Sequence, residues 1–372
     1  MESPPYQLIS YIAPSAPATR RPAEGRLAFL RPEIGFTPNW YRTHLRIDFG
    51  ERWHADPAYR RETVLAMRAE LRKRFPGSPI GGIDKDNSPL DLLTGVQGGC
   101  LVAAIFGVPI LYAPDSWPTC APRFLTDEEL ASIKPPDLDK NPAFQALMSQ
   151  VEWIAESEGR VEGFINWQGI LNNAQRLRGQ QIFIDMVESP DLCRPLFGAI
   201  RDTILEGTRR LRDFQRRTGA DYRFLTLSNC LVNLVSPRQY RERLLPYDRE
   251  IAEATDCIGV HNCAWNANPY LSDYARLPRV GYVDMGMDSD LKRARELFPQ
   301  ARRAIMYTPM DVENKTLAEI SRDLERIAAD YGPCDLVCAD IEAGTPDSKV
   351  LGILGACAEI SARHGRTGPL RG

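Results

Sequence analysis

The sequence predicts a (β/α)8 TIM barrel, a single α/β domain with an irregular extension at its N-terminus. The main observation is a regular alternation of short apolar segments and amphipathic helices from about residue 145 to the C-terminus. The apolar segments are rich in Val, Ile and Leu, which is typical of parallel strands covered by helices. Five or more such units, without a glycine-rich dinucleotide loop, favour a barrel over an open doubly wound sheet.

The elements behind this prediction follow one another along the chain. Predicted helices occupy residues 57–75, 144–157 and 191–217. Predicted strands occupy residues 161–166, 224–228, 257–260, 281–283, 303–307 and 335–337. Two further helices have recognisable starts. Ser236 and Pro237 provide an N-cap and a proline in the first turn, and Thr316 with Glu319 forms a capping box.

The composition indicates a globular protein and argues against two classes of function. The 372 residues are 43% hydrophobic and 26% charged, with a formal net charge of -3. This balance argues against a broad basic surface for nucleic acid. No stretch approaches the ~18 consecutive apolar residues of a membrane span, and the N-terminus does not resemble a secretory signal. Nine cysteines without a disulfide-like framework indicate a reduced, cytoplasmic setting with free or metal-bound thiols.

The N-terminal segment differs from the rest of the chain. Residues 1–35 form an arm rich in Pro, Ala and Arg, and its prolines preclude long regular structure. Such an arm is either disordered or wraps around another subunit, which would suit an exchange contact in a homodimer. Residues 36–366 form the predicted barrel.

A histidine and a cysteine two residues apart form the most informative motif. His261 and Cys263 follow the predicted strand 257–260, and residues i and i+2 of a strand point to the same face. Their nitrogen and sulfur can therefore meet at one point, and both atoms are good zinc ligands. The alternative is a buried small cysteine and a histidine that hydrogen-bonds a nearby carbonyl.

Other polar and aromatic side chains follow the predicted strands, where barrel enzymes place their active sites. Asp284 is a candidate catalytic residue, or a residue that caps an adjacent helix. The candidates for substrate binding are Asn166, Gln168, Asn229, Trp265 and Tyr307. The alternative for the asparagines is hydrogen bonding to loop backbone, and for the aromatic residues it is ordinary packing.

From about residue 85 onward the chain resembles the uroporphyrinogen decarboxylase superfamily. That group includes the decarboxylase and the zinc methyltransferases that move methyl groups between corrinoid proteins and thiols or tetrahydrofolate. The motifs that carry the resemblance are Gln97-Gly98, Gln168-Gly169-Ile170, Leu177-Arg178-Gly179, Ser236-Pro237, Leu245-Pro246-Tyr247, His261-Asn262-Cys263, Val283-Asp284 and residues 340–346. The arginine-rich N-terminal motif of the decarboxylase branch is not found, so the resemblance favours the methyltransferase branch.

The methyltransferase branch uses a His-x-Cys motif and a distant cysteine as zinc ligands. The resemblance therefore implies His261, Cys263 and Cys338 as the zinc site. Cys338 departs from the family pattern, because it lies one residue too far from the Thr-Pro pair that follows. Asp284 or Glu342 is then expected to act catalytically, as a displaceable oxygen ligand or by orienting His261.

The resemblance implies a zinc-dependent methyltransferase. It would move a methyl group between a corrinoid such as cobalamin, or a methylated small molecule, and a zinc-activated thiol or tetrahydrofolate. A corrinoid protein would be the partner, because the chain shows no corrinoid-binding module of its own. Two alternatives stay open. One is a metal-free, decarboxylase-like lyase that acts on a small carboxylate substrate through Asp284, and the other is a non-catalytic barrel that binds a corrinoid or tetrapyrrole.

Overall fold

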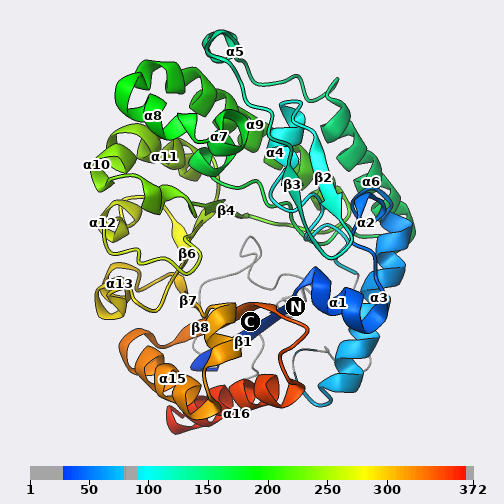
Figure 1. Ribbon diagram of the computed structural model, residues 1–372, viewed down its shortest axis with the longest axis vertical. Helices are drawn as coiled ribbons and strands as arrows, with labels where there is room; N and C mark the ends of the chain where they lie inside the picture. The colour runs from blue at the N-terminus through cyan, green and yellow to red at the C-terminus, as the bar shows by residue number, and fades with distance from the viewer. Residues whose placement is uncertain (1–27, 79, 81–89, 366–372) are drawn as a thin grey trace.

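The computed structural model describes residues 28–78, 80 and 90–365. Its centre is a parallel sheet of six strands in the order β1-β8-β7-β6-β5-β4. These strands are β1 (Leu30–Phe36), β4 (Phe224–Ser228), β5 (Cys257–His261), β6 (Val280–Met285), β7 (Arg302–Met306) and β8 (Cys334–Ile341). The sheet curves around the centre of the molecule with helices on its outside (Figure 1).

The segments around Asp91 and Glu162 follow β1 in the chain and occupy the places of the second and third strands of a barrel. Asp91 and Glu162 form an isolated parallel bridge. A full strand was predicted over residues 161–166, but the structure has only this bridge there. Gly163 explains the difference, because its φ of 100° interrupts extended backbone. Among the described residues, the hydrogen-bonded ladder ends at β1 on one side and at β4 on the other.

Helices and a small hairpin complete the fold. The helices before β4 are α1 (Pro38–Leu45), α2 (Glu51–Ala55), α3 (Pro57–Arg74), α4 (Leu101–Ile105), α5 (Asp127–Ser132), α6 (Pro142–Glu158), α7 (Ile170–Arg178), α8 (Gln181–Glu188) and α9 (Pro190–Arg217). Those after β4 are a 3-10 turn (Val232–Leu234), α10 (Pro237–Gln239), a π turn (Tyr240–Leu244), α11 (Leu245–Glu253), α12 (Leu271–Tyr274), α13 (Leu291–Leu297), α14 (Pro309–Asn314), α15 (Leu317–Tyr331) and α16 (Asp347–Arg363). The hairpin consists of β2 (Ile110–Ala113) and β3 (Ser116–Cys120).

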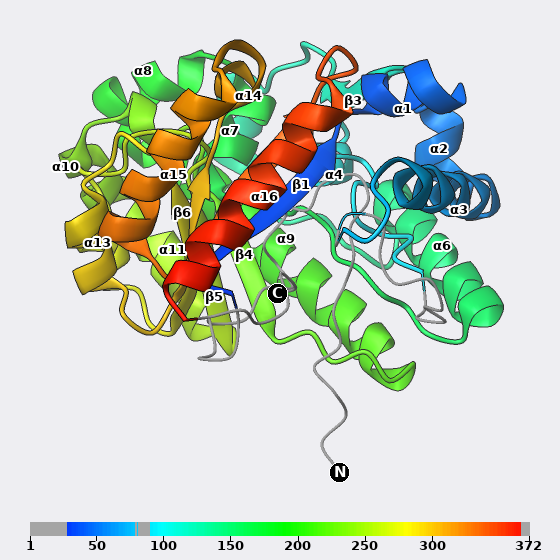
Figure 2. The same ribbon diagram turned by 90° about the horizontal axis from the view of Figure 1, so that it is seen from below.

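The helices pack against the outer face of the sheet. Helix α15 contacts α16, and α16 lies along β1, so the first and last elements of the described chain are side by side (Figure 2). None of the described helices combines the length and the apolar character that a membrane crossing requires.

Several boundaries differ from the sequence prediction in ways that matter below. The predicted capping box forms at Thr316, and the predicted N-cap at Ser236 also forms a capping box, with Gln239. Strand β1 begins at Leu30, inside the range 1–35 that was assigned to the arm, while residues 1–27 of that arm lie outside the described residues. Strand β8 extends to Ile341, well beyond the predicted end at residue 337.

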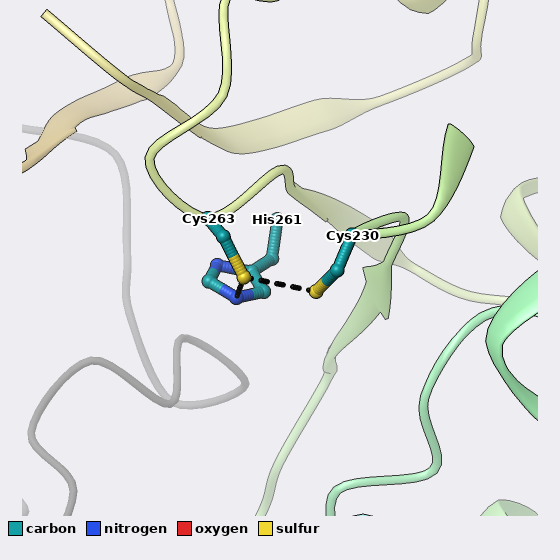
Figure 3. A group of neighbouring side chains, drawn as sticks. All are labelled: Cys230, His261 and Cys263. Atoms are coloured by element: carbon teal, nitrogen blue, oxygen red, sulfur yellow. Dashed lines mark hydrogen bonds between the residues drawn. The ribbon is translucent and has the colours of Figure 1, made fainter. Parts of the chain in front are cut away.

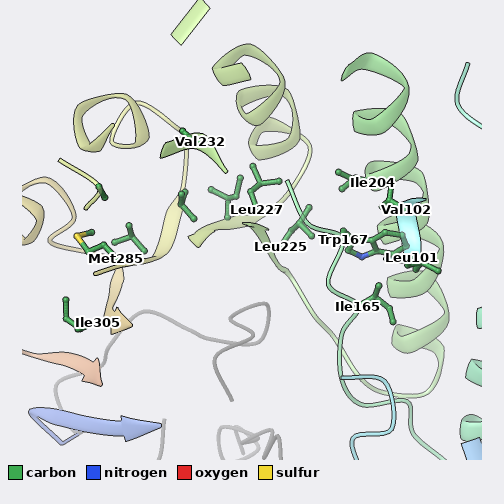
Figure 4. Packing of buried hydrophobic residues seen from close by; sticks show 14 of the residues in the cluster. Leu101, Val102, Ile165, Trp167, Ile204, Leu225, Leu227, Val232, Met285 and Ile305 are labelled. Carbon is green, nitrogen blue, oxygen red and sulfur yellow. The ribbon is translucent and has the colours of Figure 1, made fainter. Parts of the chain in front are cut away.

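The two faces of the sheet are lined by different residues. On β8, Leu336 and Cys338 belong to a large apolar core that also contains helix residues such as Ile353. Val337 and Ala339 of the same strand face the other way and form a smaller cluster with Phe224, Tyr282 and Ala304 of other strands. Figure 4 shows part of the large core between strands and helices. Strand residues therefore alternate between an outer, helix-covered face and an inner face.

Candidate metal centre

Three metal-binding side chains meet at the end of β5 and in the loop after β4. The donor atoms of Cys230, His261 and Cys263 all lie within 4.8 Å of one another. The Cys263 Sγ atom is 3.0 Å from the Sγ of Cys230 and 3.1 Å from the Nε2 of His261 (Figure 3). In the part of the chain that the structure describes, this is the one group of three or more such ligands.

Strand register explains why these side chains converge. Ser228, the last residue of β4, lies opposite His261. The ladder continues one step further, since the backbone N–H of Asn229 donates to the His261 carbonyl at 2.7 Å. Cys230 and Cys263 each lie two residues beyond the pair formed by Ser228 and His261, in the turns that follow the two strands. The Cys263 backbone has a φ of 53°, a conformation uncommon outside glycine.

A buried carboxylate orients the histidine. The Oδ2 of Asp284 is 2.6 Å from the Nδ1 of His261 and also accepts a hydrogen bond from the Tyr282 hydroxyl at 3.0 Å. Its Oδ1 accepts from the backbone N–H of Asn262 at 2.7 Å. Asp284 is completely buried, so these contacts fix its position. With Nδ1 engaged, Nε2 faces the thiols, as is usual for a histidine that binds a metal.

The electrostatics of the group favour a cation. The hydrogen bond with Cys263, helped by His261 and opposed by burial, holds the pKa of Cys230 well below its usual value. The same hydrogen bond, followed by burial, raises the pKa of Cys263. Burial would lower the pKa of His261, but Asp284 and the two sulfurs outweigh it and raise that pKa well above its usual value. A divalent metal ion replaces protons at such a site.

The residues present fit zinc. Two cysteine sulfurs and an imidazole nitrogen are a common zinc-binding set, and three protein ligands leave a fourth position for a substrate in catalytic sites. All three donor atoms are close enough to contact one ion. The hydrogen bond between Asp284 and His261 supplies the carboxylate support that zinc-bound histidines usually have.

Cys338, the third ligand expected from the resemblance, does not belong to this group. Because β8 continues to Ile341, Cys338 lies within the strand and not after it. Its side chain is on the outer face, fully buried in the apolar core, and burial raises its pKa to about 12. Cys230 lies beside His261 and Cys263 instead.

The two carboxylates expected to be catalytic are in different surroundings. Asp284 contacts His261, as described above. Glu342, just after β8, accepts hydrogen bonds through Oε2 from the Thr37 hydroxyl at 3.3 Å and the Asn39 side chain at 3.4 Å. Glu342 therefore connects the end of β8 to the start of α1 and lies outside the metal-binding group.

Two of the predicted substrate-binding residues lie beside the metal centre. The Oδ1 of Asn166 accepts hydrogen bonds from the backbone N–H of Gln168 at 3.1 Å and from the Ser228 hydroxyl at 3.4 Å. The Oε1 of Gln168 accepts from the Asn172 side chain at 2.7 Å. The Oδ1 of Asn172 accepts from the backbone N–H of Leu231, the residue after Cys230, at 3.1 Å, so these amides lie next to the loop that carries Cys230.

The other three predicted substrate-binding residues have different roles or none that the contacts define. The Asn229 side chain donates to Asp248 at 2.9 Å, and the Tyr307 hydroxyl donates to Asp323 at 2.8 Å. Both side chains therefore contact residues of the helix layer. Trp265 is 51% exposed in the loop that follows Cys263.

Sequence reasoning missed Cys230 as a ligand, although a signal was present. Cys230 comes two residues after the predicted strand 224–228, and Cys263 comes three residues after the next predicted strand, 257–260. Consecutive strands of a parallel barrel are neighbours, so their carboxyl ends are adjacent. The position of both cysteines just after consecutive strands was therefore the signal that could have identified Cys230.

Comparison with known proteins supports the fold. No family model matches the sequence, and no curated protein is similar to it. Among solved structures, a methyltransferase from Methanosarcina mazei has a TM-score of 0.63 over 91% of this chain and 95% of that chain. The two sequences are 18% identical. At this identity the likeness concerns the fold, and it agrees with a TIM-barrel-like arrangement.

Proposed function

We propose that the protein is a zinc-dependent methyltransferase. It moves a methyl group between a corrinoid such as cobalamin, or a methylated small molecule, and a thiol or tetrahydrofolate. The convergence of Cys230, His261 and Cys263 at the carboxyl end of the sheet, where barrel enzymes carry their active sites, is the observation that carries the proposal. The fold shared with a methyltransferase adds support.

Three side chains would hold the metal, and a fourth would orient one of these ligands. Cys230 and Cys263 provide sulfurs, and His261 provides Nε2 because Asp284 holds the proton on Nδ1. When bound, zinc lowers the pKa of a thiol substrate and so makes its thiolate available at neutral pH. The amides of Asn172 and Gln168, next to the loop that carries Cys230, would contact the substrate.

In the proposed reaction, the methyl group moves as the equivalent of a methyl cation. The thiol loses its proton to solvent, and its sulfur forms a new bond to the methyl carbon. With methylcobalamin as donor, the cobalt–carbon bond breaks and its electron pair remains on cobalt. We propose a separate corrinoid protein as the physiological partner.

The surroundings of Asp284 favour this proposal over a metal-free lyase. A lyase would need that carboxylate to reach the substrate. Instead, its oxygens accept hydrogen bonds from His261, Asn262 and Tyr282, which leaves it well suited to orient a ligand and poorly placed to exchange protons with a substrate.

The direct test is methyl transfer from free methylcobalamin to a thiol, followed anaerobically by the loss of methylcobalamin absorbance. Zinc-loaded protein should turn over, and a chelator should abolish turnover until zinc is restored. Cys263→Ser should be inactive, whereas Cys338→Ala should remain active because Cys338 lies in the outer core. Parallel assays with tetrahydrofolate identify the acceptor.

Two results would contradict the proposal. Lyase activity on a carboxylate substrate that survives chelation and Cys263→Ser would establish the metal-free alternative. Tight binding of a corrinoid or tetrapyrrole, with no turnover of any methyl donor, would establish a binding protein.

A further inference from the structure

The candidate metal centre brings two cysteine sulfurs into direct contact. The Sγ atoms of Cys230 and Cys263 are 3.0 Å apart, although the two residues are separated by 33 positions in the chain. Figure 3 shows the two side chains pointing toward one another from neighbouring loops. A disulfide bond holds its sulfurs about 2.05 Å apart, so an approach of about 1 Å would join these two.

Both cysteines lie in turns beyond the strands. Strand β4 ends at Ser228, and one further hydrogen bond continues the ladder, from the Asn229 backbone N–H to the His261 carbonyl. Cys230 and Cys263 come after this point, in turns at the carboxyl ends of β4 and β5. Turns move more readily than the strands they follow. The sulfurs can therefore approach each other while the hydrogen bonds of the sheet stay intact.

The same two thiols are open to reagents in solution. Cys230 and Cys263 are each partly exposed, whereas Cys334, Cys338 and Cys357 are buried in the apolar core. Exposure decides which cysteines react in a folded protein, because the reagent has to reach the sulfur. A small oxidant can therefore reach this pair without unfolding the barrel.

A bond between these sulfurs would remove two of the three metal ligands. Zinc binds cysteine as the thiolate, and a disulfide sulfur carries no such negative charge. His261 would then remain as a single ligand, still held through Nδ1 by Asp284 at 2.6 Å. One imidazole is far from the set of three or four ligands that zinc sites in proteins provide. A disulfide and a zinc ion therefore compete for the same two sulfurs.

We infer that the metal centre is a redox switch, in which a disulfide between Cys230 and Cys263 excludes zinc and bound zinc prevents the disulfide. This inference rests on the proposed function, because it concerns the regulation of the same site. The metal-free dithiol is the form that becomes oxidised. Zinc protects the centre, and oxidation of the metal-free protein keeps it from being loaded.

The oxidant in this inference is a small linear disulfide, and the reaction is two successive thiol–disulfide exchanges. The thiolate of one cysteine attacks a sulfur of the reagent, whose S–S bond breaks and releases one thiol. The second cysteine attacks the mixed disulfide, forms the bond between Cys230 and Cys263, and releases the second thiol. The protein loses two electrons and two protons, and the reagent gains them as two thiols. An excess of a dithiol reductant reverses both steps.

The test exposes metal-free wild type to oxidised glutathione. Peptide mass spectrometry locates the new bond, and competition with a chromophoric chelator measures zinc affinity before oxidation, after oxidation and after treatment with dithiothreitol. Oxidation should weaken zinc binding by more than about 100-fold, because loss of two ligands exceeds the 10–100-fold effect of losing one supporting partner. Dithiothreitol should restore the original affinity.

The protecting effect of zinc gives a second, quantitative readout. At a free zinc concentration about 100 times its dissociation constant, only about 1% of the protein is metal-free, so formation of the disulfide should slow about 100-fold. Mg²⁺ at the same concentration is the control. It prefers oxygen ligands to thiolates, so it should leave the rate unchanged.

Two variants separate this pair from the other cysteines. Cys230→Ser should form no internal bond, and its Cys263 should stop at the mixed disulfide, which mass spectrometry detects as an added glutathione. Cys120→Ser is the matched control, because it removes a cysteine that is also partly exposed but lies outside the metal-binding group. It should form the bond at the wild-type rate.

The outcomes distinguish this inference from the proposed function. If reduced wild type binds zinc, but oxidation joins other cysteines or leaves zinc affinity unchanged, the redox switch is wrong and the zinc centre stands. Equal rates of oxidation with and without saturating zinc would lead to the same conclusion. If the fully reduced protein does not bind zinc, the proposed function fails, and the inference that depends on it fails as well.

Discussion

The two ends of the sheet both bury polar groups, but they satisfy them in different ways. At the amino end, Asp335 of β8 pairs with Arg31 and lies 2.5 Å from the Nε of Arg302. Arg302 also contacts Glu33 at 3.2 Å. Two cations thus meet two carboxylates, and the protein balances these charges by itself.

At the carboxyl end no such set of paired cations and carboxylates surrounds the candidate metal centre. Two cysteine sulfurs and the Asp284 carboxylate surround a single imidazole. A divalent cation from solution would complete this set, whereas the amino end needs nothing further. The comparison distinguishes a buried polar cluster that stabilises the fold, at the amino end, from one that is available to bind a ligand, at the carboxyl end. Barrel enzymes usually separate stability and activity in this way.

The largest expected effect concerns the amino end. Asp335→Asn leaves Arg31 and Arg302 without their shared buried partner, so the free energy of unfolding should fall by about 3–5 kcal/mol. Urea denaturation measures this change. Glu325→Gln is the control, since its ion pair with Arg363 is exposed and should contribute less than about 1 kcal/mol.

The comparison also requires that the Asp335→Asn protein, at temperatures where it is folded, bind zinc like wild type. Loss of zinc from the folded variant would show that the two ends are coupled, and would contradict the division described above.

The next effect concerns Asp248, which lies beneath the loop that carries Cys230. It is buried, and its Oδ2 accepts hydrogen bonds from Asn229 and Tyr240, both at 2.9 Å. Burial, opposed by these hydrogen bonds, raises its pKa from 3.8 to about 6. The folded state therefore binds this proton more tightly than the unfolded state. The contribution of Asp248 to stability is fully present below about pH 4 and is lost as the pH rises through about 6.

Asp248→Asn should remove this pH dependence, which amounts to at most about 3 kcal/mol for a shift of about two units. Urea midpoints of wild type and variant, measured from pH 4 to pH 7, give the comparison. The pKa of Asp91 is likewise raised to about 6, mainly by burial, but Asp91 is present in both proteins, so the difference between the two curves isolates Asp248. Parallel curves would contradict the assignment.

The smallest effect in this series concerns support of the metal ligand. Asp284→Asn weakens the hydrogen bond to the Nδ1 of His261, so zinc affinity should fall about 10–100-fold. Competition with a chromophoric chelator measures it. Glu342→Gln is the matched control, because Glu342 contacts Thr37 and Asn39 and not the ligands. Equal losses in both variants would argue against a specific role for Asp284.

Periodicity predicted most of the fold, because the strands and helices after residue 145 have clear apolar patterns and caps. Strand β4 has the predicted bounds, residues 224–228, and helix α9 begins within one residue of its prediction. The region around Glu162 was harder, since Gly163 interrupts a segment whose composition is typical of a strand.

The candidate site was predicted in part. His261 and Cys263 follow from their spacing at a strand end, whereas the third ligand depended on where β8 ends. An apolar segment does not mark its last residue when the next residues can also extend, and β8 continues through Ala339 and Asp340 to Ile341. This extension places Cys338 on the outer face. Identifying Cys230 requires the register between β4 and β5, which is a property of the folded sheet.

Zinc content of the protein, purified without a metal-affinity tag, tests the central claim most directly. Wild type, Cys230→Ala and Cys338→Ala are compared by elemental analysis after equal exposure to zinc. The account predicts about one zinc per chain in wild type and in Cys338→Ala, and almost none in Cys230→Ala. Zinc retained by Cys230→Ala but lost from Cys338→Ala, or no zinc in wild type, would contradict it.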